Sequence, residues 1–146
     1  MTNEEINTIA SNYTEDVLES TNIPIDEALS GDIVIAVSPS TVTRTATSAG
    51  FSRTIRVALE TADGRTHSWF NGTLPIAASK SSTAGTIAIK DSATAVTLVN
   101  GIGNVVVNGS ATAWLANDTN TLTVSKNANV PLFANVASAT SVETII

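Results

Sequence analysis

Short runs of alternating apolar and polar residues, separated by Asp-Gly or Asn-Gly dipeptides, constrain the fold more than any other feature of the sequence. Both central positions of a type I′ turn need a positive φ, which Asn, Asp and Gly adopt at low cost. Alternation with a period of two is typical of a strand that buries one face. The pattern predicts antiparallel strands joined by tight turns, at residues 63–64, 71–72, 100–101 and 108–109.

The stretch from Arg53 to Gly72 carries the strongest of these signals. Its first half alternates up to Glu60, and a second strand is predicted over residues 66–70. Adjacent strand residues point to opposite faces, so Trp69 and Phe70 are not both expected in the core. A two-residue turn would place Phe70 inside and Trp69 outside, partly buried at a sheet edge. A longer loop would exchange the two, because a slip of one residue turns the whole strand over.

The rest of the chain repeats this style without a helical pattern after residue 30. Pro75 is expected to confine its strand to a sheet edge, and Arg44 is expected to face water from another edge strand. About eight strands without intervening helices predict an all-β, antiparallel sandwich, since parallel strands need long crossovers. The predicted segments besides the central hairpin are 32–37, 41–50, 73–78, 86–89, 95–99, 105–107, 112–115 and 121–124.

An acidic helical arm is predicted over residues 1–29, ahead of the sandwich at 30–127. Thr2 to Ser20 reads as an amphipathic helix with a capping box formed by Thr2 and Glu5. The apolar stripe of this helix is expected to cover an open end of its own sandwich, to dock on another subunit, or to stay disordered until it binds. Its members are Ile6, Ile9, Ala10, Tyr13 and Val17.

The last segment, residues 128–146, is an apolar C-terminal tail or a final strand. It ends on Ile145 and Ile146 and also holds Leu132 and Phe133. Such side chains would promote aggregation if they were exposed on a free monomer. The tail is therefore expected to add a strand to the sandwich or to reach a neighbouring subunit.

Charge and composition exclude several classes of partner. Residues 1–32 hold eight acidic and no basic side chains, while the remainder holds seven basic and five acidic ones, a net charge of +2. The acidic arm would repel phosphate, so no nucleic acid partner is expected; it is a solvated helix face or contacts a basic neighbour. No apolar run has the length of a membrane helix, and the N-terminus does not resemble a signal peptide. We expect synthesis in the cytoplasm and no membrane partner.

Residues that perform catalysis form no recognisable group in the sequence. Cysteine is absent, which excludes disulfides, thiolate metal sites and a cysteine nucleophile. His67, the only histidine, would face away from Ser68 on a strand and is expected to be half exposed. The acidic residues beyond the arm are expected mostly at turns, where Asp binds its own backbone. No catalytic residue, cofactor or metal site is predicted, and residues 117–120 lack most ligands of a calcium loop.

Four stretches between Gly31 and Ser125 carry a family resemblance: DIVIAVSP, RVALETADGRTHSWFNG, VTLVNGIGNVVVNG and LTV. Together they resemble the bacterial immunoglobulin-like domains of tailed-bacteriophage virion proteins. The likeness covers about two-thirds of the chain. It implies an immunoglobulin-like sandwich and an accessory structural role, as a head decoration, fibre or tail component. No catalytic residue carries over from this family.

The expected function is that of a non-enzymatic structural virion protein, most simply a capsid decoration or tail accessory subunit. It would be made in the host cytoplasm and would attach to major capsid or tail subunits through its terminal arms, as a homo-oligomer. The candidate interface residues are Ile6, Ile9, Tyr13, Val17, Trp69, Leu132, Phe133, Ile145 and Ile146.

An alternative function is that of a cell-surface or extracellular adhesion module that binds carbohydrate. Its partner would be a host-surface glycan stacked on a platform of Trp69, Trp114 or Tyr13, or held by the Asn-rich turns. Aromatic residues exposed in a row would favour this function.

Overall fold

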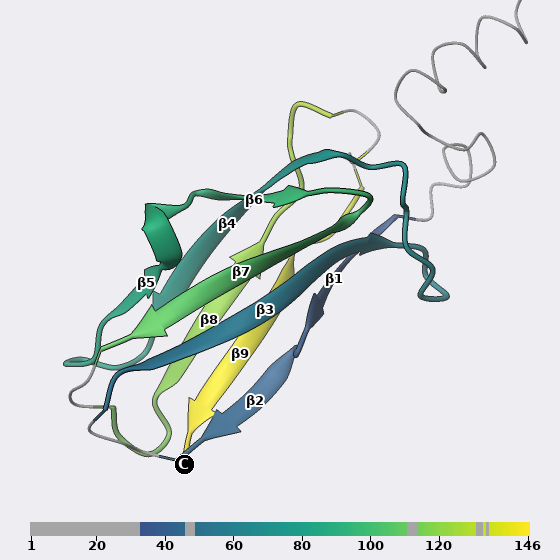
Figure 1. The fold of residues 1–146 in the computed structure, drawn as a ribbon. Coiled ribbons are helices and arrows are strands. Elements are labelled where there is room, and N and C mark those ends of the chain that lie inside the picture. The colour runs from purple at the N-terminus through teal and green to yellow at the C-terminus, as the bar shows by residue number, and fades with distance from the viewer. Residues whose placement is uncertain (1–32, 46–48, 111–113, 131–132, 134) are drawn as a thin grey trace, which may run out of the picture.

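The computed structural model describes residues 33–45, 49–110, 114–130, 133 and 135–146. These residues form two β-sheets packed face to face (Figure 1). The arm with its stripe, and Leu132, lie outside the described residues. The strands are β1 (Val34–Ser38), β2 (Thr41–Arg44), β3 (Phe51–Glu60), β4 (Gly72–Lys80), β5 (Ile87–Ile89), β6 (Ala95–Leu98), β7 (Ile102–Gly109), β8 (Thr119–Val124) and β9 (Ala139–Ile145), with a short 3₁₀ turn, η1 (Lys90–Ser92).

The two sheets hold four and five strands in the orders β1-β3-β7-β5 and β2-β9-β8-β4-β6. All paired strands are antiparallel except β2 and β9, which run parallel. The chain crosses between the sheets at one edge between β1 and β2, through a cis Ser38–Pro39 peptide bond. It crosses at the other edge between β5 and β6, through η1. The predicted all-β sandwich is thereby confirmed.

The C-terminal segment is a strand of this sandwich. In Figure 1, β9 (yellow) lies between β2 and β8. Thr121 of β8 is paired with Val142, and Thr41 of β2 is paired with the same residue on the other side. Of the two alternatives for residues 128–146, the structure shows the final strand.

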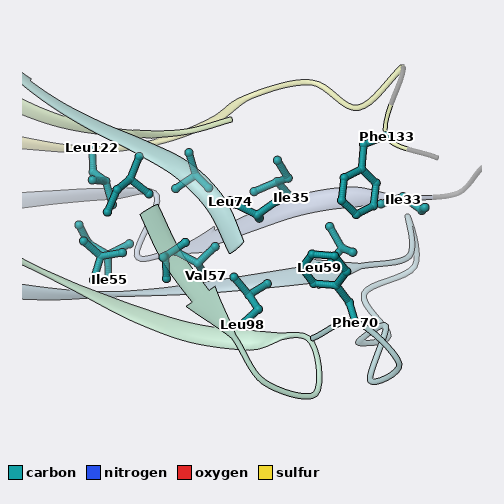
Figure 2. Packing of buried hydrophobic residues seen from close by; sticks show 14 of the residues in the cluster. Ile33, Ile35, Ile55, Val57, Leu59, Phe70, Leu74, Leu98, Leu122 and Phe133 are labelled. Atoms are coloured by element: carbon teal, nitrogen blue, oxygen red, sulfur yellow. The ribbon is translucent and has the colours of Figure 1, made fainter. Parts of the chain in front are cut away.

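The main core lies between the sheets and alternates along each strand as expected. On β3, Ile55, Val57 and Leu59 point inward and are fully buried. Figure 2 shows Phe70 and Phe133 at one end of this cluster, with Ile55 and Leu122 near the other. The Phe70 and Phe133 rings are 5.3 Å apart. A smaller apolar cluster of Phe51, Trp114 and Ile145 lies separately.

The predicted hairpin strand over residues 66–70 is wrong. β1 and β7 occupy the two edges of β3 up to Ala58, so the segment contacts only the end of β3, through an isolated bridge between Thr66 and Glu60. Residues 61–71 instead form a loop whose turns are closed by bonds such as Phe70 N–H to the His67 carbonyl. Because this backbone is not extended, strand alternation does not apply. Trp69 and Phe70 are therefore both buried, with 4% and 9% of their surface exposed.

One of the four Asx-Gly dipeptides has the full backbone predicted for it. Asn100 and Gly101 have φ values of 52° and 80° and join β6 to β7. In Asp63-Gly64, Gly64 also has a positive φ, 91°. This dipeptide lies in a loop over residues 61–65 and not in a two-residue turn. The predicted turns at Asn71-Gly72 and Asn108-Gly109 are wrong, because Gly72 begins β4 and Gly109 ends β7.

Pro75 was expected to confine its strand to a sheet edge, and this expectation is wrong. β4 lies between β8 and β6. The proline stands where β4 changes partner: residues 72–75 pair with β6 and residues 76–80 pair with β8. Its carbonyl accepts the Ser125 N–H at 2.9 Å, one residue beyond the end of β8. The missing proline N–H therefore removes at most one bond at the end of a ladder.

Candidate interaction surface

The interface residues predicted on the described part of the chain are mostly inside the sandwich. Trp69, Phe133 and Ile145 are 4%, 0% and 1% exposed. Ile146 is 60% exposed and follows the last residue of β9. The first three side chains form part of the core in this conformation, so a partner would have to contact other residues of the body.

A buried polar network joins the two sheets between the main core and the smaller cluster. Arg53 of β3 points inward, donates to Asn120 Oδ1 at 2.9 Å and donates to Ser141 Oγ at 2.7 Å. It also donates to the backbone carbonyls of both residues. Ser141 Oγ in turn donates to the Pro39 carbonyl at 2.6 Å. One guanidinium thereby ties β3 to β8, β9 and the β1–β2 crossing.

Glu143 extends this network to the edge strand β2. Its carboxylate is 1% exposed, accepts from Asn120 Nδ2 at 3.0 Å and accepts from Arg44 Nε at 3.1 Å. The Arg44 guanidinium also lies 4.5 Å from the centre of the Phe51 ring, in a cation–π contact. Arg44 was expected to face water. This expectation is wrong, because the buried Glu143 carboxylate needs a charged partner.

Burial determines the electrostatics of Arg53. Desolvation lowers the pKa of its guanidinium, and the nearby Glu143 carboxylate opposes that shift. Within this network, each polar side chain has hydrogen-bond partners. A satisfied network of this kind fixes the register of the strands, so we assign it a structural role.

The sequence contained a signal for this network that the prediction did not use. Arg53 has the same parity as Ile55 and Val57, and Glu143 has the same parity as Ile145. A charged residue on the inward positions of a strand needs a partner inside. The period of two identifies charged residues at inward positions, but it does not identify the residues to which they hydrogen-bond.

His67 is held inside the 61–71 loop. It is fully buried, and its Nδ1 accepts the indole N–H of Trp69 at 3.0 Å. The two rings make an edge contact at 5.5 Å between their centres. The expectation of a half-exposed strand histidine is wrong, because residues 66–70 form a loop closed by short-range backbone bonds and not a strand. This bond occupies the nitrogen that a general base would need.

Asp63 and Asp118 bind nearby residues of their own loops, as predicted for turn aspartates. Asp63 accepts from the Thr61 hydroxyl and from Arg65, which lowers the pKa of its carboxyl below 3.8, the hydrogen bond from Thr61 being the largest cause. Asp118 Oδ2 accepts the Leu115 N–H at 2.8 Å. Within the described ranges, no three His, Asp or Glu side chains gather as a metal site.

An exposed apolar row crosses the outer face of the four-stranded sheet. Ala36, Ala58 and Ile102 stand opposite one another on β1, β3 and β7, and Val99 bridges to Ile102. Opposite residues of antiparallel strands point to the same face. Val34 lies two residues from Ala36 on the same side. We call these five residues, Val34, Ala36, Ala58, Val99 and Ile102, the apolar row.

The apolar row is exposed at its ends and covered at its centre. Val34, Val99 and Ile102 are 43%, 61% and 38% exposed, whereas Ala58 is fully buried. Arg56 and Glu60 flank Ala58 on β3 and approach each other to 3.9 Å. The outward face of an antiparallel sheet is usually polar. Val99 and Ile102 are adjacent at one end of the row, and Val34 lies at the other end across β3. Exposed aliphatic side chains on that face mark a candidate contact surface.

A cleft of about 380 Å³ opens where β6 diverges from β7. β5 pairs only with Val107–Gly109 of β7, so the cleft lies beside the earlier part of that strand. Its volume is within the range of small-molecule sites. However, its two charged lining residues, Lys90 and Asp91, are adjacent and of opposite sign. This lining does not select a class of ligand.

In the described part of the chain, no helix has the length and apolarity to cross a membrane. Comparison with protein-family models gives no match, and no curated protein matches the sequence.

Several solved structures are similar to this chain at low identity. WR4, a Caenorhabditis elegans MSP family member, has a TM-score of 0.46 and 12% identity, over 77% of this chain and 97% of that chain. SSP-19, an MSP-domain protein like family member in Caenorhabditis elegans, has a TM-score of 0.42 and 17% identity, over 75% and 97%. A conjugative transposon lipoprotein from Bacteroides eggerthii has a TM-score of 0.40 and 16% identity, over 68% and 89%.

Proposed function

We propose that the protein is a non-enzymatic structural subunit that works by adhesion between protein surfaces. The proposed setting is a bacteriophage virion, where it would serve as a capsid decoration or tail accessory protein. It attaches through its acidic N-terminal arm and self-associates. The observation that carries the proposal is the apolar row, since an exposed aliphatic surface on a rigid sheet is suited to binding another protein surface.

The strand order supports an immunoglobulin-type sandwich. The order β1-β3-β7-β5 corresponds to strands A-B-E-D of that fold, and β9-β8-β4 corresponds to G-F-C. β6 extends the second sheet beside β4, although it follows β5 in the chain. The inter-sheet disulfide of antibody domains is absent, because the chain has no cysteine. The Arg53 network connects the same two layers instead.

The virion setting is supported by the sequence resemblance. The aromatic platform of the carbohydrate-binding alternative is less well supported, since Trp69 and Trp114 are 4% and 3% exposed. Flat, exposed aromatic rings are what a sugar face would need. We therefore favour protein adhesion over glycan binding.

Size-exclusion chromatography with light scattering tests this function on the full chain and on a chain lacking residues 1–29. The proposal predicts that the full chain forms oligomers or binds purified virion shells, and that loss of the arm abolishes both. A glycan array is the matched control and should stay silent. Two monomeric proteins that bind no shell would refute the proposal.

A further inference from the structure

The apolar row has the dimensions of a surface for one helix. It spans four strand positions, or roughly 14 Å at the usual strand spacing. Its exposed members are three of the five large apolar side chains exposed on the described residues. Leaving such a row in water is unfavourable, because apolar surface is stabilised by burial. A segment that covers the row would stabilise the protein.

The chain itself enters the described structure beside this row. Val34 is the second described residue and stands at one end of the row. Residues 21–32 separate Ser20 from Ile33, and twelve residues can extend across about 40 Å. That reach exceeds the length of the row, so the segment Thr2–Ser20 can lie on it.

The pattern of this segment complements the row. Its predicted apolar stripe extends from Ile6 to Val17, which is about 16 Å along a helix and comparable to the row. The segment before residue 33 holds eight acidic and no basic side chains, and the following residues carry a net charge of +2. Arg56 lies beside the row with 42% of its side chain exposed and is only 3.9 Å from Glu60, so an acidic side chain of the arm would share this guanidinium with Glu60.

From these observations we infer that the apolar row is the docking surface of residues 2–20 of the same chain. This inference rests on the proposed function. The arm that is proposed to attach the subunit to a partner would also bind the apolar row. Tethering gives the arm an effective concentration in the millimolar range, so its own arm fills the row in the free subunit. Exchange of arms between copies would use the same contact to join them.

Disulfide trapping in the full chain tests this docking directly, because the natural chain has no cysteine. The variant Ile9→Cys/Ile102→Cys pairs the arm with the row. The control Ile9→Cys/Ala77→Cys pairs the arm with an exposed position of β4 on the other sheet. At about 1 µM protein, the first pair should close within one chain roughly tenfold faster than the control, as tethering on a docked surface requires.

The two pairs separate the possible outcomes. Equal rates for both pairs, or a first pair that links mainly between two copies, would overturn the inference. Thermal unfolding of each reduced variant checks that it is folded before oxidation. If trapping fails while the natural chain still forms oligomers, the docking is wrong and the proposed function stands. If trapping succeeds but the chain never associates or binds a shell, the docking stands and the proposed function fails.

Discussion

At the scale of single residues, Arg53 determines how the two sheets are joined. Its guanidinium bonds to side chains and carbonyls of Asn120 and Ser141. Substitution by Met leaves these acceptors buried without a donor. Each such group costs about 1–3 kcal/mol, so Arg53→Met should lower the free energy of unfolding by about 3 kcal/mol or more. Urea denaturation measures the loss.

Arg56→Met is the matched control for that experiment. Arg56 lies on the outer face of the same strand and makes only a distant, partly exposed ion pair with Glu60. Its loss should cost less than about 1 kcal/mol. Equal losses for the two variants would show that the inward network has no special role in stability.

Gly109 is a second residue whose identity is set by packing. A Cβ at this position would lie 2.1 Å from Phe51 Cζ. The Phe51 ring is also held by Trp114, at 5.4 Å between ring centres, and by the Arg44 guanidinium. Gly109→Ala should therefore destabilise the protein by about 2 kcal/mol, within the range for overpacked cores.

A double-mutant cycle identifies the cause of that loss. If the clash with Phe51 is responsible, Gly109→Ala should cost much less in a Phe51→Ala background, because the ring that blocks the methyl group is gone. Additive losses of stability in the cycle would contradict this account.

Asp63 makes a prediction about pH. The Thr61 hydroxyl, with Arg65 beside it, lowers the pKa of the Asp63 carboxyl below 3.8. A lowered folded-state pKa gives stability that is present above the unfolded value and is lost as pH falls through the folded value. An NMR titration should place the Asp63 midpoint below 3.8, and Thr61→Val should raise it. A midpoint that stays unchanged in Thr61→Val, as it should in the control Thr54→Val, would contradict the assignment.

At the scale of elements, the Asn100-Gly101 turn positions two members of the apolar row. It joins Val99 to Ile102, and the Gly101 N–H donates to the Phe70 carbonyl at 2.8 Å. Gly101 has a φ of +80°, and a Cβ there would lie 2.5 Å from the His67 carbonyl oxygen. Gly101→Ala should cost about 2 kcal/mol or more, from backbone strain and this clash.

Asn100→Gly is the control for the turn. Its φ of 52° suits glycine, so the change in the free energy of unfolding should stay within about 0.5 kcal/mol. Thermal or urea unfolding compares the two variants. A tolerated Gly101→Ala would mean that the turn relaxes away from the 61–71 loop.

The strands that pack on one face could be predicted from the sequence, while their partners could not. Ile55, Val57 and Leu59 reveal β3, and Leu122 and Val124 reveal β8, because burial of alternate residues leaves a period of two. The period does not say which edge of β3 is free. The hairpin to residues 66–70 was therefore predicted where β1 and β7 in fact pair.

The candidate surface was predictable only in part, for a similar reason. Val34, Val99 and Ile102 lie far apart in the sequence, and only the register of β1, β3 and β7 brings them into one row. Trp69 was proposed as a surface residue because an extended strand would point it outward. The loop backbone turns it inward, and a local pattern carries no signal of such a turn.

At the scale of the whole molecule, the C-terminal strand β9 is an inner strand of the five-stranded sheet. The Arg53 network joins the two sheets. Ile145, which was predicted to contact a partner, packs in the smaller apolar cluster with Phe51 and Trp114. Adhesion is therefore proposed to depend on the outer face of the four-stranded sheet and on the arm that precedes it.

Sedimentation equilibrium of the full chain, from low micromolar to about 1 mM, where exchange of arms can compete with tethering, tests this central claim most directly. We expect reversible self-association in the natural chain, and Ile102→Asp should weaken it at least about tenfold, since a charge would be buried in an apolar contact. Ala77→Asp, on the outer face of the other sheet, should associate like the natural chain. A chain that stays monomeric throughout, or that associates equally with Asp at residue 102, would contradict the account.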